Sequence, residues 1–300
     1  MTYAAGGLIQ ANDYTTGIAQ INTLWSTGTS NAGYGQTTIP TVSVGQTVGA
    51  AEWNSFFTAQ TKMAAHQGTA ITALPTVVAG GTITYLSQLA PGGVLISNNR
   101  LNAVAQGTTS TSVNTTTTTW STSKTVTFTV TFASHNNARY FFNAGGQIGI
   151  SASHPAGTGS SINQLISSLC SEAGTTWFSS PISGTVSLAG INYSGVTKSG
   201  GGYPAGSTIN TNYGFYSAGS TSTQIMKQIS DFSYHAYGTS TFMTISVAYN
   251  GSGTLTFTVL YDEVPDGAVV STGTVTTLTV RPPSTTYLTD SWGTPGLSNV

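Results

Sequence analysis

The chain has 300 residues, a formal net charge of −1 and only 5% charged residues, whereas an ordinary globular protein has about 25%. A near-neutral chain lacks the basic field that attracts nucleic acid or an anionic membrane surface, so we expect neither partner. No stretch approaches the ~20 apolar residues of a membrane-spanning helix. Since such a stretch is missing, we expect no membrane insertion, and residues 1–10 also lack the positive start and the apolar core of a signal peptide.

Residues 1–107 predict a helical region for attachment and oligomerisation. Three segments, 9–28, 48–68 and 95–107, have helical character, and each runs into a glycine. These glycines, Gly28, Gly68 and Gly107, are 40 and 39 residues apart. The spacing favours a repeated unit of about 40 residues, and chance alignment of Ala- and Thr-rich stretches is the alternative.

Residues 108–119, TTSTSVNTTTTT, have low complexity. Such a run is either a linker or a threonine-rich edge strand. In both cases it marks the boundary between two patterns, and we assign it as a linker.

After residue 119 the apolar pattern changes to period two. Val126, Phe128, Val130 and Phe132 alternate with threonine, as expected for a strand with one buried face. Similar runs predict strands within 138–151, 184–193, 224–238, 241–250, 253–264 and 273–282. Asn250-Gly251 lies between two of these runs and is the strongest hairpin signal in the chain.

The fold class that follows is α+β. Residues 120–283 are expected to form an antiparallel β-sandwich with one inserted amphipathic helix at 160–173. Pro282-Pro283 ends the last strand because proline cannot continue the ladder. Residues 284–300 are expected to be a C-terminal tail.

The usual signatures of catalysis are missing from the sequence. There is no nucleophile elbow, zinc-protease motif, phosphate-binding loop or dinucleotide-binding glycine motif. We therefore predict no catalytic residues, no cofactor and no enzymatic activity. The single cysteine, Cys170, has Ile166 and Leu169 as apolar neighbours and is expected to be a buried thiol. The histidines lack ligand-like spacing and are expected to be structural: His66, His135, His154 and His235.

Asp262, Glu263 and Asp266 are the only cluster of carboxylates, in YDEVPDG. Oxygen ligands at this spacing are a weak candidate for calcium, and a solvated turn is the favoured alternative. We therefore predict no metal site.

The stretch 198–220 is a long glycine-rich loop with four aromatic residues that are candidates for ligand binding. Flat aromatic rings among serine, asparagine and glycine are typical of contact surfaces for carbohydrate or protein. The alternative is a loop that covers the core with its aromatic rings inward. The four candidates are Tyr203, Tyr213, Phe215 and Tyr216.

Segments 21–37, 42–54, 99–107 and 138–148 together resemble virion structural proteins of tailed bacteriophages. Within that group the chain is most similar to tail-fibre and baseplate proteins of phages of aquatic bacteria, cyanophages among them. The resemblance runs from residue 8 to about 150 and continues more loosely through the later strands. It implies a location on the virion tail after assembly in the host cytoplasm, and it carries no catalytic residues.

The resemblance leads to a ranked set of functions. The first is a non-enzymatic structural component of the tail that is associated with the fibre or the baseplate and has other tail proteins as partners. We expect it to be a homotrimer, because short apolar helices gain stability by packing across a threefold axis. The alternatives are a glycan-binding receptor-recognition module, with a host surface glycan as ligand, and a capsid decoration or cement protein. A polysaccharide-degrading enzyme is the least favoured.

Overall fold

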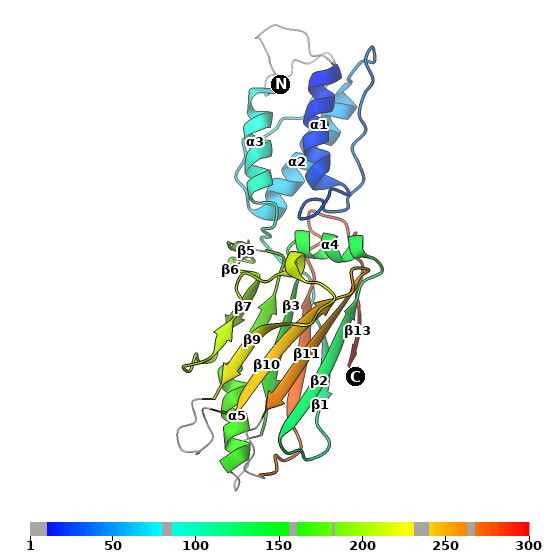
Figure 1. Cartoon of the computed structure of the whole chain (residues 1–300). Coiled ribbons are helices and arrows are strands. Elements are labelled where there is room, and N and C mark those ends of the chain that lie inside the picture. Colours follow the sequence, from blue (N-terminus) through cyan, green and yellow to red (C-terminus); the bar gives the residue numbers. More distant parts are fainter. Residues whose placement is uncertain are drawn as a thin grey trace.

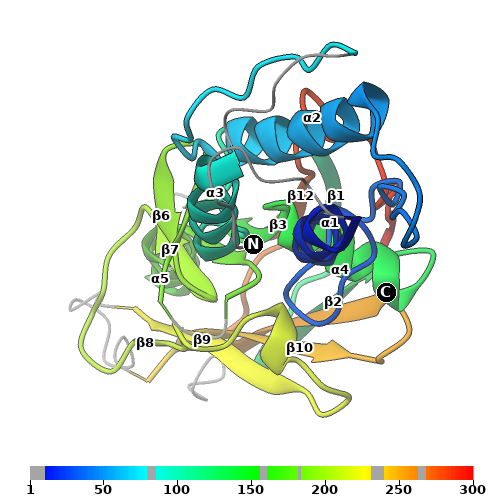
Figure 2. The ribbon, with the colours of Figure 1, turned by 90° about the horizontal axis from the view of Figure 1, so that it is seen from above.

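The structure is a computed structural model that describes residues 11–79, 86–155, 161–181, 184–230, 240–262 and 268–299. Three helices stand beyond one end of a β-sandwich (Figure 1). Viewed from that end, α2 lies on the side of β1 and β12, and β9 and β10 lie on the other side (Figure 2). The three helices are α1 (Ala11–Trp25), α2 (Ala50–Gln67) and α3 (Leu86–Asn98).

An aromatic cluster holds the helical region together. Trp53, Phe56 and Phe57 lie on the buried face of α2, and Tyr14 of α1 meets Trp53 edge-on at 5.1 Å between ring centroids. Helix α2 ends, as predicted, at Gly68, which takes the left-handed conformation with φ 69°. Helix α3 ends at Asn98 instead of running to the predicted glycine at 107, so the third segment departs from the expected repeat.

The fold class is α+β, as the sequence predicts, with two antiparallel sheets packed face to face. The first sheet has the order β1 (Ser110–Thr115), β12 (Val275–Arg281), β3 (Gln147–Ser153), β4 (Thr175–Phe178), β7 (Val196–Ser199). The second has the order β13 (Gly296–Asn299), β2 (Ser123–Thr131), β11 (Thr254–Asp262), β10 (Phe242–Tyr249), β9 (Thr223–Ile229), β8 (Thr208–Ile209). A separate hairpin consists of β5 (Val186–Leu188) and β6 (Ile191–Tyr193).

The two sheets bury their alternating apolar residues between them. On β2, Val126, Phe128 and Val130 are at most 1% exposed, which confirms the period-two prediction. Phe178 of the first sheet and Phe257 of the second meet edge-on at 5.7 Å between ring centroids. Burial of such large side chains is the main source of stability for the sandwich.

The predicted hairpin at Asn250 is confirmed. Strands β10 and β11 pair from Phe242 opposite Asp262 to Tyr249 opposite Leu255. The Asn250 side chain organises the turn, because its Oδ1 accepts hydrogen bonds from the backbone N–H groups of residues 252, 253 and 254 at 2.9–3.1 Å.

Two segments predicted to lie outside the sandwich form strands of it. The linker prediction for 108–119 is wrong for β1, which pairs with β12 from Ser110 opposite Val280 to Thr115 opposite Val275. Threonine favours strands, and an edge strand needs no second apolar face. The expected tail at 284–300 contains β13, which pairs with β2 from Gly296 opposite Thr131 to Asn299 opposite Phe128.

The run predicted to start a strand at residue 138 is a helix, α4 (His135–Asn143). Ser134 caps it, since its hydroxyl accepts a hydrogen bond from the N–H of Asn137 at 3.2 Å. Gly145, with φ 92°, then turns the chain into β3. Helix α4 crosses the end of the sandwich that faces α1–α3 (Figure 1).

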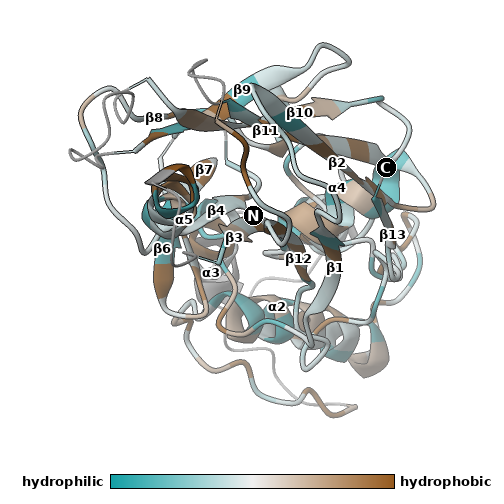
Figure 3. Cartoon of the chain, turned by 90° about the horizontal axis from the view of Figure 1, so that it is seen from below, coloured by the Kyte–Doolittle hydropathy of each residue, from teal (hydrophilic) through white to brown (hydrophobic). Residues whose placement is uncertain are grey.

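The helix predicted at 160–173 is confirmed as α5 (Ser161–Ala173). It lies at the end of the sandwich opposite α4 (Figure 1). Its buried side includes Ile162, Leu165 and Leu169, and Figure 3 shows one apolar and one polar side. The described part of the sandwich therefore has an α-helix at each end.

Candidate functional site

The aromatic residues predicted as a ligand surface do not lie together on the surface. Tyr203 is 62% exposed, and Lys198 Nζ lies 4.2 Å from its ring centroid. Phe215 is only 3% exposed and stacks on Phe142 of α4 with 4.5 Å between centroids. Its prediction as a ligand contact is wrong, because the short helix η1 (Phe215–Ser217) turns the ring into the core.

Tyr213 and Tyr216 are half-buried and pack against the main core. The Tyr216 hydroxyl lies 2.5 Å from Asn143 Oδ1, to which it donates a hydrogen bond. Burial raises the pKa of Tyr216, so the phenol stays protonated and keeps this bond. Tyr216 also borders a cavity.

The weak calcium candidate cannot be assembled from the described residues. Asp262 is the last residue of β11, whereas Glu263 and Asp266 lie outside the described residues. Within the described part of the chain, no group of three or more His, Cys, Asp or Glu side chains is placed to hold a metal ion.

Three histidines have structural partners, and His235 lies outside the described residues. His66 Nε2 donates to the carbonyl of Ala144 at 3.0 Å, and His135 Nδ1 lies 2.7 Å from the Tyr249 hydroxyl. His154 Nδ1 lies 2.8 Å from Thr274 Oγ1 in the buried interior. Cys170, as predicted, is buried, and burial raises the pKa of its thiol to about 12, which leaves it protonated and unreactive.

The connection between α1 and α2 is clamped onto the sandwich by Arg139 of α4. The guanidinium donates to the backbone carbonyls of Ser30 at 3.0 Å, Thr27 at 3.2 Å and Ala32 at 2.9 Å. Arg139 is 6% exposed, so carbonyl oxygens replace the water that its charge would otherwise keep. We call the segment 26–36 the junction loop.

Gln36 secures the other end of the junction loop to the C-terminal segment. Its Oε1 accepts hydrogen bonds from Thr289 N at 2.8 Å and Thr289 Oγ1 at 2.7 Å. Its Nε2 donates to the Thr289 carbonyl at 3.0 Å. With Arg139 on one side and Gln36 on the other, the helical region is fixed to the sandwich at two separate points.

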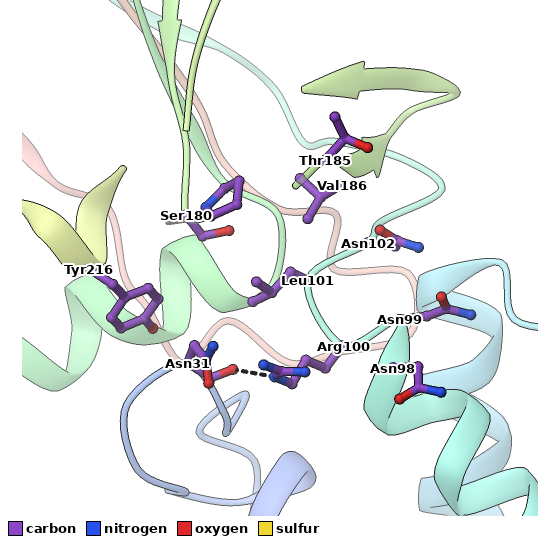
Figure 4. A pocket seen from close by; sticks show the side chains of 11 residues that line it. Asn31, Asn98, Asn99, Arg100, Leu101, Asn102, Ser180, Thr185, Val186 and Tyr216 are labelled. Atoms are coloured by element: carbon purple, nitrogen blue, oxygen red, sulfur yellow. Dashed lines mark hydrogen bonds between the residues drawn. The ribbon is translucent and has the colours of Figure 1, made fainter. Parts of the chain in front are cut away.

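A cavity of about 470 Å³ opens beside the junction loop, which is within the size range of small-molecule sites. It lies between the helical region and the sandwich, and its lining comes from the junction loop, the end of α3, the segment after β4, the start of β5, and η1 (Figure 4). The lining is predominantly polar: Asn31, Asn98, Asn99, Arg100, Leu101, Asn102, Ser180, Pro181, Thr185, Val186 and Tyr216. Of these residues, only Tyr216 was predicted from the sequence as a ligand contact.

His66 is expected to make the stability of the junction depend on pH. The imidazole is 1% exposed, and burial lowers its pKa from 6.5 to about 4. As the pH falls below 6.5 the unfolded chain takes up a proton at His66 and the folded chain does not, so the folded state loses stability. The difference between the His66 pKa values of the unfolded and the folded chain lowers the free energy of unfolding by about 2 kcal/mol by pH 5.

Urea unfolding at pH 7 and pH 5 would measure this loss. His66→Gln keeps an amide donor for the Ala144 carbonyl and removes the titration, so its stability should differ less between the two pH values. His135→Gln is the matched control. His135 is exposed, so replacing it should remove less of the pH dependence of stability than replacing His66. An unchanged pH dependence in His66→Gln would contradict the prediction.

No family model, no curated protein and no solved structure matches this chain. Among the described residues, no helix is long and apolar enough to cross a membrane.

Proposed function

We propose that this protein is a non-enzymatic structural component of a bacteriophage tail, associated with the fibre or the baseplate. The observation that carries the proposal is the doubly clamped junction loop, which holds a helical region and a β-sandwich end to end. The resemblance to tail proteins that we infer from segments 21–37 and 138–148 agrees with the proposal, and both segments contribute to that junction. An attachment part and a projecting part must stay rigidly connected to transmit force between a particle and its surroundings.

The two ends of the molecule suit different tasks. The helical region would attach to the baseplate or to the preceding fibre segment, and the sandwich would project outward. The described surface carries few charges, and in a protein with 5% charged residues hydroxyl and amide groups provide the solubility.

Immunogold electron microscopy of intact particles would test the location. Antibody raised against the sandwich should label the tail tip or the fibres of the phage that carries this sequence. Label over the head would reject the tail proposal in favour of a capsid decoration protein. Absence of the chain from purified, washed particles would reject a virion role altogether.

We expect a homotrimer in solution, formed through the helical region. Val94 and Leu95 of α3 are 60% and 44% exposed, and a groove between α1 and α3 beside Val94 is lined by Ile21 and Leu24. Exposed apolar side chains on a short helix are typical of a surface that another subunit covers.

Light scattering after size exclusion should give three times the chain mass of 30.8 kDa. Val94→Asp should shift the species toward the monomer, because a carboxylate buried between copies would lose its hydration. Val113→Asp is the matched control, since Val113 is 49% exposed on the edge strand β1, away from the helices. A monomeric wild-type chain, or equal masses for the two variants, would contradict the trimer.

A further inference from the structure

The cavity beside the junction loop is lined by polar groups that have no hydrogen-bond partner among the described residues. Ser180 is 1% exposed, it lines the cavity, and its hydroxyl has no hydrogen-bond partner among the described residues. Figure 4 shows this hydroxyl on the cavity side of the chain. A hydroxyl in the wall of a cavity can both donate to and accept from a ligand that enters it.

The asparagine side chains around the cavity are also only partly used. Asn102 Oδ1 accepts from Ser187 N at 2.9 Å, and Asn99 Nδ2 donates to Thr69 Oγ1 at 3.0 Å. The opposite atom of each amide has no partner in the described part of the chain, and neither do the side-chain amides of Asn31 and Asn98. Each amide offers both a donor and an acceptor, which is the combination that pairs with neighbouring hydroxyl groups.

Arg100 places one positive charge at the cavity. Its Nε donates to the Asn31 carbonyl at 2.9 Å and its Nη1 to the Ser97 carbonyl at 3.0 Å. These two bonds hold the guanidinium in place and leave Nη2 without a partner among the described residues. No carboxylate is among the described residues that line the cavity, so the charge is open to an anionic group on a ligand.

We propose that this cavity binds an acidic saccharide, a sugar unit with one carboxylate and several hydroxyl groups. The carboxylate would meet Nη2 of Arg100, and the hydroxyl groups would pair with the asparagine amides and Ser180 Oγ. Tyr216 forms one wall against which a sugar ring can lie. One guanidinium balances the single charge of a carboxylate but only part of the charge of a phosphate, and a lipid or an apolar compound would meet a lining that is mostly amide and hydroxyl.

This inference does not depend on the tail proposal, because it concerns binding by the isolated chain. It also differs from the exposed loop surface expected from the sequence, because the cavity uses Tyr216 and excludes Tyr203. If the chain binds the saccharide but is found on the phage head, the saccharide site stands and only the tail location is rejected.

The first experiment compares two probes that differ at a single carbon. Methyl β-glucuronide carries a carboxylate where methyl β-glucoside carries a hydroxymethyl group. Titration followed by amide NMR should shift resonances of the junction loop and residues 98–102, and the uronide should bind at least about tenfold more tightly than the glucoside. No shift at these residues up to about 10 mM uronide, or equal binding of both sugars, would overturn the proposal.

Variants separate binding from folding. Ser180→Ala removes a hydroxyl that pairs with no described residue, so it should weaken uronide binding about fivefold while changing the stability little. Asn98→Ala should also weaken binding, and Asn192→Ala, an exposed amide on β6, is its matched control. Arg100→Gln should abolish the preference for the uronide over the glucoside.

Arg100→Gln also removes two internal hydrogen bonds, so its amide spectrum must first be shown to match the wild type outside the cavity. Ser180→Ala and Asn98→Ala decide the question if that variant does not fold. Wild-type uronide affinity in both of them would place the sugar elsewhere and overturn the proposal.

Discussion

Replacing Arg139 by alanine is expected to lower the free energy of unfolding by about 4 kcal/mol. The guanidinium is 6% exposed and donates to the carbonyls of Ser30, Thr27 and Ala32 and to Asn136 Oδ1. Alanine would remove this donor from all four acceptors, of which the Ser30 carbonyl also lies 3.0 Å from the Tyr216 hydroxyl, and it would leave a cavity next to α4. Hydrogen bonds from a charged donor contribute more than neutral ones, so several lost together exceed the usual effect of a point substitution.

Equilibrium unfolding in urea would measure the loss. Lys62→Ala removes a positive charge from an exposed position on α2 and is the matched control, with an expected change within about 0.5 kcal/mol. Arg139→Lys should recover only a small part, because a single ammonium group cannot reach carbonyls on separate turns of the junction loop. If Arg139→Ala unfolds at the wild-type urea concentration, the junction is not held by this residue.

The alternation of Val126, Phe128 and Val130 was sufficient to predict β2 because residues on one strand reveal their own buried face. The same is true of α5 and of the Asn250 hairpin, whose signals lie within a few residues. The α4 error shows the limit of such patterns. The aromatic run from Tyr140 to Phe142 fits a buried strand as well as it fits a helix. The signal that distinguishes the two is polar: Ser134, which caps α4.

The junction could not be predicted because its partners are far apart in the chain. Arg139 meets carbonyls near residue 30, and Gln36 meets Thr289 more than two hundred positions away. Backbone carbonyls carry no side-chain signature, so a sequence gives no sign that they receive a guanidinium. The cavity has the same origin, since its asparagines from residues 31 and 98–102 become neighbours only when the junction loop is in place.

The 198–220 loop illustrates how one composition fits two structures. Tyr203 is exposed, as a contact surface would require, whereas Phe215 faces the core. Gly214 allows this, because a side chain there would collide with the backbone carbonyl oxygens of Pro181 and Ser179. The close approach of two backbones, invisible in the sequence, decides which aromatic ring turns inward.

Phe215→Ala is accordingly expected to destabilise the fold by about 3–4 kcal/mol. Its ring lies 4.5 Å from that of Phe142 and 5.1 Å from that of Tyr249, measured between centroids, so truncation opens a void in a packed aromatic cluster. Unfolding in urea should show a lower midpoint with an unchanged slope, because the surface exposed on unfolding stays nearly the same.

Two companion substitutions make the result specific to packing. Phe215→Leu keeps most of the volume and should cost less than about 1.5 kcal/mol. Tyr203→Ala, at an exposed site in the same loop, should change the stability by no more than about 0.5 kcal/mol. A residue that served only as a surface contact would give the opposite pattern: Phe215→Ala would unfold like the wild type. That outcome would restore Phe215 as a candidate for ligand binding and reject its place in the core.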